Sequence, residues 1–247
     1  ELLRAVAAAD NENSYRIFYA SPKPTHRLPP LPENFSVTHL PFHDIWLARV
    51  WHRLRVPLPV EFFTGSIDVY HSPDFTLPPR LPGTPGLLTV HDLSFVRDPA
   101  SASPTLRSYL QVVVRRSVNR ASHILADSEA TKTDLVELYR TPADKITVLY
   151  AGVGPSFTPV RDPEQLAAVR RRYGIGNAPF IFSISTLQPR KNYCRLIEAF
   201  DIALGKTDYM LVLAGNKGWL HKEIFDEVRR RNLKNKVLFT GFVDDVH

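Results

Sequence analysis

The sequence predicts an α/β fold built from two doubly wound domains, and two observations lead to this prediction. Short, apolar, β-rich runs alternate with helical segments, which is the pattern of parallel strands joined by crossover helices. A Gly- and Pro-rich stretch, AGVGPSFTPVRDPEQ at 151–165, separates two sets of these runs and is typical of a linker. The 247 residues suffice for two ordinary domains. We therefore predict a first domain at 1–154, a linker and helix at 155–177, and a second domain at 178–247.

The first domain is predicted to contain six strands. Its opening stretch, ELLRAVAAAD, is typical of the middle of a helix. Ser128 stands where the N-cap of a later helix would lie, so its hydroxyl can accept a backbone N–H of that helix. The expected strands are 15–20, 35–40, 67–72, 86–92, 123–128 and 145–152, and the expected helices are 44–55, 104–121 and 129–140.

The second set of runs begins after a linker helix. The stretch EQLAAVRRRYGIG at 164–176 predicts a helix that a glycine closes. Further on, apolar residues recur at the spacing of one helical face over 192–204, with Asn192 as the predicted N-cap. The expected strands of this domain are 180–185, 209–215 and 236–242, and its helices are 192–204 and 217–231.

The amino-acid composition indicates the class of protein but does not identify its function. With 44% hydrophobic and 23% charged residues, the chain has the composition of a soluble globular protein. A net charge of +6 favours anionic partners such as nucleic acid, anionic lipid or phosphorylated small molecules. Cys194 is the single cysteine, so no disulfide forms within the chain and the residue is expected to be a small helix side chain. No apolar run approaches the roughly 20 residues of a membrane span.

Two cations at the end of a predicted strand indicate a phosphate site. In FSISTLQPRKN at 182–192, Arg190 and Lys191 stand directly before a helix, whose N-terminus carries a partial positive charge. Cations are unfavourable there unless an anion arrives, and a phosphate at a helix N-terminus accepts backbone N–H groups as well as charged side chains. On physical grounds alone, a solvated basic loop remains an equal alternative.

In open parallel sheets, ligands bind beyond the carboxyl ends of the strands. The residues that follow the predicted strands are therefore the candidates for a functional site. They are His71, His91, Asp92, Asp127, Ser128, Gly152, 186–191, 215–217 and 241–243.

At this point the motifs resemble a known family. STLQPRKNYCRLIEAF at 185–200 is similar to the donor-phosphate loop of the retaining glycosyltransferases of family 4, the group 1 enzymes of two-domain GT-B architecture. Six further stretches resemble the family in the same order and extend the similarity over nearly the whole chain: DVYHSPDFTLPP, LLTVHDLSF, RASHILADSEATKTDL, ITVLYAGV, LVLAGNKGW and VLFTGFVDDV. Mannosyltransferases and other hexosyltransferases of polysaccharide and lipid-linked glycan assembly resemble it most.

The resemblance implies two Rossmann-like domains that face a cleft, with a nucleotide-diphosphate sugar on the second domain and the acceptor on the first. Arg190 and Lys191 would hold the diphosphate in place of a metal and act in catalysis together with His91. No cofactor is expected, and the donor is GDP- or UDP-linked. The implied donor-binding residues are Thr186, Arg190, Lys191, Asn192, Gly215, Phe242 and Val243, and the acceptor-side residues are His71, Asp92 and Ser128. Many relatives have an Arg where this chain has Thr186, so the number of cationic phosphate ligands stays open.

Each candidate also has a structural interpretation. His91 and Asp92 can be a loop pair that holds a turn, His71 can end its strand, and Ser128 can simply cap a helix. His39 and His43 do not predict a metal site, because a proline lies between them and no third ligand follows at a suitable spacing.

The alternatives for partners and location follow from charge. IWLARVWHRLRVPL at 45–58 predicts either a basic amphipathic helix on an anionic membrane or, as we favour, a domain helix with snorkelling arginines. The expected location is the cytoplasm, with peripheral contact at the inner face of the membrane. Dehydrogenase and P-loop motifs are absent. No nucleic-acid partner is expected, and the remaining alternative is a non-catalytic anion-binding protein, for nucleic acid or glycan, of the same fold.

Both ends of the sequence look truncated. The second domain shows three strand-like runs, whereas a doubly wound domain usually has about six. Relatives continue past GFVDDV into a segment with two glutamates that contact the donor. We therefore expect the chain by itself to bind the diphosphate poorly.

Overall fold

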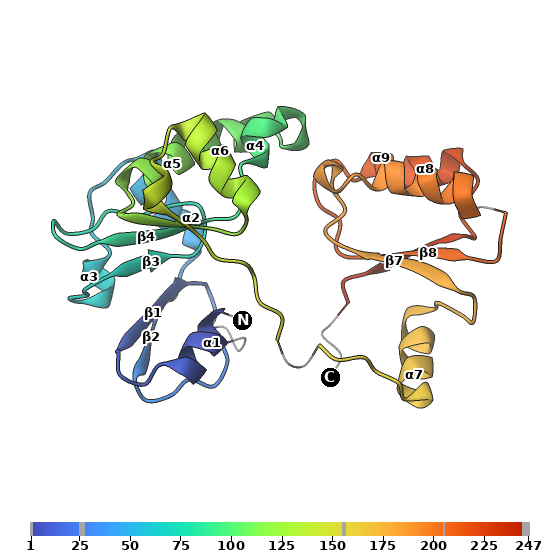
Figure 1. The fold of residues 1–247 in the computed structure, drawn as a ribbon, viewed down its shortest axis with the longest axis horizontal. Helices are drawn as coiled ribbons and strands as arrows, with labels where there is room; N and C mark the ends of the chain where they lie inside the picture. The colour runs from blue at the N-terminus through green and yellow to red at the C-terminus, as the bar shows by residue number, and fades with distance from the viewer. Residues whose placement is uncertain (1, 25–27, 155–156, 205, 244–247) are drawn as a thin grey trace. The chain divides into compact units, whose positions relative to one another are not determined.

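The computed structural model describes residues 2–24, 28–154, 157–204 and 206–243. The chain forms two compact units, unit 1 over residues 1–100 and 104–154 and unit 2 over residues 101–103 and 155–247. Every strand in the described residues pairs in parallel with its neighbour, so the predicted α/β class is confirmed (Figure 1).

Among the described residues, unit 1 contains six strands, each inside a predicted run. Its strands are β1 (Tyr15–Ala20), β2 (Phe35–Leu40), β3 (Tyr70–Ser72), β4 (Gly86–Val90), β5 (His123–Ala126) and β6 (Ile146–Val148). Its α-helices are α1 (Leu2–Ala9), α2 (Asp44–Ala48), α3 (Glu61–Thr64), α4 (Ser94–Arg97), α5 (Pro104–Arg120) and α6 (Glu129–Tyr139). A π-turn η1 (Arg49–Arg53) and the 3₁₀ turns η2 (Pro99–Ser101) and η3 (Ala143–Lys145) complete it.

The strands of unit 1 form two sheets. One contains β1 and β2, and the other has the order β3-β4-β5-β6. Because strands in sequence order with right-handed crossovers place their helices on one face, α5 and α6 lie over the same side of the larger sheet (Figure 1). The core between them is apolar and includes Leu88, Val90, Ile124, Val114 and Leu135, all fully buried.

The smaller sheet is anchored by aromatic side chains rather than by a crossover helix. The ring of Phe18 on β1 packs against Trp51 and Phe63, with centroid distances of 6.3 and 5.4 Å. Trp51 also donates its indole N–H to the carbonyl oxygen of Leu58 at 2.8 Å. The predicted helix 44–55 is therefore α2 followed by a π-turn, because Trp51 and the chain that returns at Leu58 draw the backbone onto β1.

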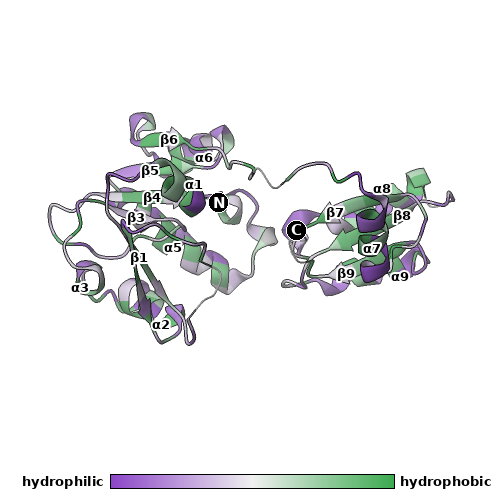
Figure 2. Ribbon diagram, turned by 90° about the horizontal axis from the view of Figure 1, so that it is seen from below, coloured by the Kyte–Doolittle hydropathy of each residue, from purple (hydrophilic) through white to green (hydrophobic). Residues whose placement is uncertain are grey.

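In the part of unit 2 that the structure describes, there are three strands with helices mainly on one face. It consists of α7 (Pro163–Tyr173), β7 (Phe180–Ile184), a 3₁₀ turn η4 (Pro189–Lys191), α8 (Tyr193–Leu204), β8 (Met210–Ala214), α9 (Lys222–Arg230) and β9 (Val237–Gly241). The sheet order is β7-β8-β9, and α8 and α9 cover one face of it (Figure 1). Their core includes Ile197, Phe200, Leu211, Leu213 and Ile224. Figure 2 shows β8 in the hydrophobic colour and α7 in the hydrophilic one.

Helix ends follow their predicted caps in two cases. The Ser128 hydroxyl accepts the backbone N–H of Thr131, which fixes the start of α6. Gly174 adopts a left-handed conformation at the end of α7, which confirms the glycine stop. The predicted helix 217–231 begins later, at Lys222, because the preceding loop is paired with the end of β7 as described below.

Candidate active site

The carboxyl ends of β3, β4 and β5 bring acidic, imidazole and aromatic side chains together in unit 1. Because these strands are parallel neighbours, the loops that follow them emerge at the same edge of the sheet. Asp74 and Phe75 follow β3, His91 follows β4, and Asp127 follows β5. Two of the predicted candidates, His91 and Asp127, therefore lie in one cluster.

His91 is held from several directions. Its Nδ1 lies 2.7 Å from Oδ2 of Asp127, and its Nε2 lies 3.9 Å from Oδ1 of Asp74. The ring of Phe75 meets the imidazole edge-on, with centroids 5.4 Å apart. The Thr131 hydroxyl donates to the main-chain oxygen of His91 at 2.9 Å. The His91 side chain nevertheless remains 41% exposed, so the ring is both positioned and accessible.

The three predicted acceptor-side residues each have a partner within the fold. Asp92 accepts the backbone N–H of Ser94 at 2.9 Å, and Ser128 caps α6. Nε2 of His71 lies 2.9 Å from the hydroxyl oxygen of Thr89, and burial lowers the pKa of His71 below its ordinary value. These contacts agree with the structural interpretations of the three residues, whereas the His91 side chain is 41% exposed.

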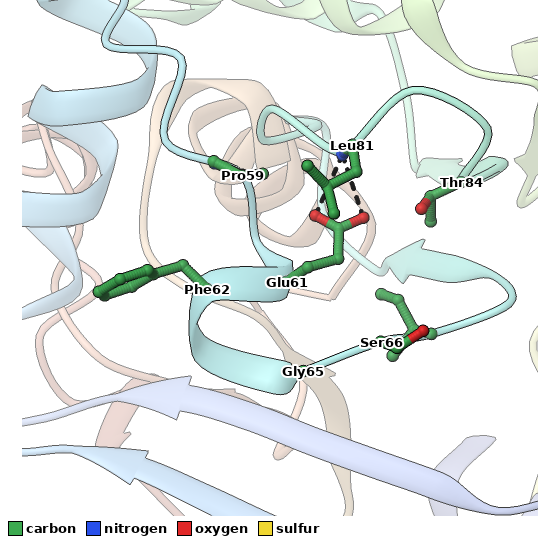
Figure 3. A pocket seen from close by; sticks show the side chains of 8 residues that line it. Pro59, Glu61, Phe62, Gly65, Ser66, Leu81 and Thr84 are labelled. Atoms are coloured by element: carbon green, nitrogen blue, oxygen red, sulfur yellow. Dashed lines mark hydrogen bonds between the residues drawn. The ribbon is translucent and has the colours of Figure 1, made fainter.

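A separate hollow lies at the opposite edge of the same sheet. It measures about 370 Å³ and is lined by residues that precede β3 and β4, among them Gly65, Ser66 and Thr84 (Figure 3). The buried Glu61 carboxylate turns into this region and accepts the Leu81 backbone N–H with both oxygens at 3.2 Å. Since it lies at the amino ends of the strands, this hollow is distinct from the His91 cluster.

In unit 2, the predicted phosphate residues lie in the segment 186–191, here called the cation loop, at the carboxyl end of β7. Arg190 and Lys191 are exposed on the turn η4. Asn192 has left-handed backbone angles (φ 54°, ψ 36°), so it ends η4 and lacks the extended backbone of a typical N-cap. α8 begins at Tyr193, and the Asn192 carbonyl oxygen accepts the Leu196 backbone N–H at 3.2 Å, so Asn192 occupies the predicted N-cap position although its backbone is not extended.

The cation loop is hydrogen-bonded to the segment 215–219, here called the GNKGW loop, which follows β8. The backbone N–H of Leu187 donates to the Asn216 oxygen, and that of Gly218 donates to the Leu187 oxygen, both at 2.9 Å. A Cβ atom placed on Gly218 would lie 2.8 Å from Cγ2 of Thr186. The two loops therefore share one backbone ladder, and Thr186 is exposed beside it.

Gly215 is required by this arrangement. Its φ of 131° is unfavourable for other residues, and a Cβ atom there would lie 2.0 Å from the carbonyl oxygen of Ser185. Its N–H donates to the Gly241 oxygen at 2.7 Å, so this group is already used within the fold. Phe242, 60% exposed, and Val243 follow directly after β9 at the same edge of the sheet.

The predicted site residues thus gather in two clusters. His91 lies with Asp74, Phe75 and Asp127 in unit 1, and the donor-binding set lies on three adjoining loops of unit 2. Sequence reasoning did not single out Asp74 or Phe75, and it named Asp127 as a candidate without its contact to His91. Their position after a strand was the available signal. Across the described ranges, no three His, Cys, Asp or Glu side chains gather as metal ligands would.

Comparison with known families covers both units. The profile described as Glycosyltransferase Family 4 matches residues 1–157, and the profile described as Glycosyl transferases group 1 matches residues 167–247. The chain is 27% identical over 179 residues to the O-antigen chain mannosyltransferase B of Escherichia coli, a match over 72% of this chain and 46% of that protein. The chain thus spans about half the length of this curated relative.

Solved structures with the same arrangement of elements include two that share the fold over almost the whole chain. The Anabaena protein HepE in complex with UDP and glucose has a TM-score of 0.64 at 18% identity, over 95% of this chain and 70% of that one. WaaG, a glycosyltransferase involved in lipopolysaccharide biosynthesis, has a TM-score of 0.62 at 15% identity, over 99% of this chain and 65% of that one.

Proposed function

Because the chain belongs to the family 4, group 1 glycosyltransferases, we propose that the protein moves a hexose from a nucleotide-diphosphate sugar to a glycan or lipid-linked acceptor. The observation that carries this proposal is the cation loop, where Arg190 and Lys191 are exposed at the carboxyl end of β7 on a backbone fixed by the GNKGW loop. Support for a nucleotide-sugar donor comes from HepE, solved with UDP and glucose.

In this proposal, the cation loop acts by electrostatics. As the glycosidic bond breaks, the electron pair stays on the leaving diphosphate, and its negative charge grows. Arg190 can form two parallel hydrogen bonds to phosphate oxygens, and Lys191 adds a compact charge. Preorganised cations of this kind stabilise the transition state more than the ground state and take the role that a divalent metal has elsewhere.

The finer specificity is also part of the proposal. Mannose is the sugar we favour, and the similarity to the E. coli mannosyltransferase supports that choice of sugar. We also propose that the transfer retains the anomeric configuration. The donor base is guanine or uracil. His91 is proposed to contact a sugar hydroxyl at the transfer site, because its exposed ring is held rigidly at the strand ends.

A binding measurement tests the proposed function. The Lys191→Ala variant should bind GDP or UDP about 10- to 150-fold more weakly than the unchanged protein, since a hydrogen bond to a charged group contributes about 1.5–3 kcal/mol. Lys234→Ala is the matched control, because Lys234 is equally exposed but lies before the amino end of β9. Two results would contradict the assignment of Lys191 as a phosphate ligand. One is equal affinity of the two variants in calorimetric titration, and the other is tighter binding of duplex DNA than of either diphosphate.

We also propose that segment 45–58 makes a peripheral contact with an anionic membrane. Ile45, Trp46 and Leu54 are 50%, 54% and 69% exposed, and the exposed Arg49 guanidinium lies 5.0 Å from the Trp46 ring centroid. Apolar side chains beside arginines are the composition of a helix at a membrane surface. None of the helices in the described residues combines the length and the apolar character needed to cross a bilayer.

Vesicle sedimentation checks this contact. Binding to vesicles that contain an anionic lipid should exceed binding to phosphatidylcholine alone, and Trp46→Ala should weaken it by about 10-fold or more, since burial of a large apolar side chain contributes about 1.5–3 kcal/mol. Ile202→Ala is the control, because it removes an exposed apolar side chain from α8 in unit 2. Equal loss in both variants would argue against a specific contact.

A further inference from the structure

The contact between His91 and Asp127 has a consequence for the protonation of the imidazole ring. An ionised carboxylate only accepts hydrogen bonds, so the 2.7 Å contact requires the proton on Nδ1 of His91. In the neutral ring, Nε2 then keeps its lone pair. Oδ1 of Asp74 lies 3.9 Å from Nε2, beyond hydrogen-bond distance, so Nε2 makes no hydrogen bond to this carboxylate.

The Asp127 carboxylate is not required by the local fold. The start of α6 is capped by Ser128, and the main chain at His91 is fixed by the Thr131 hydroxyl. The Asp127 side chain is 39% exposed, and its Oδ2 contacts the His91 ring. Its oxygen is therefore placed to act on the imidazole and not on the helix.

We propose that Asp127 is a positioning residue that fixes His91 as the Nδ1–H tautomer, so that Nε2 accepts a hydrogen bond from a hydroxyl of the sugar substrate. This inference rests on the proposed function. Asp127 acts through His91, and Nε2 is the ring nitrogen that meets the substrate. The hydroxyl donates to Nε2, and Asp127 keeps the ring from turning that lone pair away.

The tautomer can be measured without substrate. In protein with ¹⁵N-labelled histidine at about pH 8.5, the His91 signal should show a protonated Nδ1 and an unprotonated Nε2. Nine histidines contribute signals, and comparison with His91→Gln identifies the relevant one. In Asp127→Asn, the amide can donate to Nδ1, so the signal should change to the Nε2–H tautomer.

Activity supplies the second readout. Asp127→Asn should lower kcat for sugar transfer by about 10- to 100-fold, the effect of losing one hydrogen bond to a charged group, with GDP or UDP affinity unchanged. Asp127→Glu, which keeps the carboxylate, should restore part of the rate. Asp144→Asn is the control, since it removes an exposed carboxylate in η3, before the amino end of β6.

Three results would overturn the proposal. They are an Nε2–H tautomer in the unchanged protein, a ring protonated on both nitrogens at that pH, and a loss of activity in Asp127→Asn that follows a loss of melting temperature. A failure of the proposed function would give a different pair of results. Lys191→Ala would then bind GDP or UDP as tightly as the unchanged protein, while His91 would still show the expected tautomer.

Discussion

Gly215→Ala should lose about 2–6 kcal/mol of stability in unit 2, because strain at a positive φ and overpacking against backbone each cost about 1–3 kcal/mol. The added methyl group would lie 2.0 Å from the Ser185 carbonyl oxygen, which is backbone and cannot rotate away. To accommodate it, the cation loop and the end of β8 would have to separate. The same change should therefore weaken diphosphate binding.

Amide hydrogen exchange measures this loss by unit. Peptides from β7 and β8 should exchange much faster in Gly215→Ala, while those from β4 and β5 in unit 1 keep their protection. Gly152→Ala is a matched control, because a Cβ atom there meets nothing within 4 Å and the residue has no positive φ. Unchanged exchange in β7 and β8 of Gly215→Ala would show that the loops can separate without cost.

His91→Ala should reduce sugar transfer by about 100- to 1,000-fold, the range for removal of one preorganised polar group at a reacting centre. Nucleoside-diphosphate affinity should stay the same, because the proposed phosphate ligands lie on unit 2 and His91 lies on unit 1. The ring is held at main-chain and side-chain atoms, so a water molecule entering the space of the missing imidazole would not reproduce its orientation.

The measurement is a comparison of kcat with calorimetric affinity for GDP or UDP in the same preparations. His71→Ala is an informative companion, since that ring contacts Thr89 inside the sheet and is proposed to be structural. If His71→Ala lowers kcat while His91→Ala does not, the roles assigned to the two histidines are reversed.

Much of the fold could be predicted from local pattern. The runs YRIFYA and FSVTHL became β1 and β2 at their predicted bounds, because a short β-rich apolar run has few other stable states. The carboxyl ends of strands also identified His91 and the cation loop, since the parallel arrangement alone determines where those residues emerge.

Features that depend on distant contacts could not be predicted. The π-turn at 49–53 arises where Trp51 reaches Phe18 and Leu58, and the four-residue helices α3 and α4 are too short to show a period. The pair His91–Asp127 joins residues 36 apart, so no local pattern indicates it. Asn is a common N-cap residue, but the backbone angles of Asn192 are left-handed because it ends the turn η4.

The hydrogen bonds between the cation loop and the GNKGW loop also reduce the entropy cost of binding a ligand at this place. Ordering the backbone of a flexible loop costs about 1–2 kcal/mol per residue, and a loop that orders only on contact loses that amount from its affinity. Here the hydrogen bonds from Leu187 and Gly218 fix the backbone during folding. If an anion binds here as proposed, little further backbone ordering is needed, so more of the electrostatic attraction is retained as binding free energy.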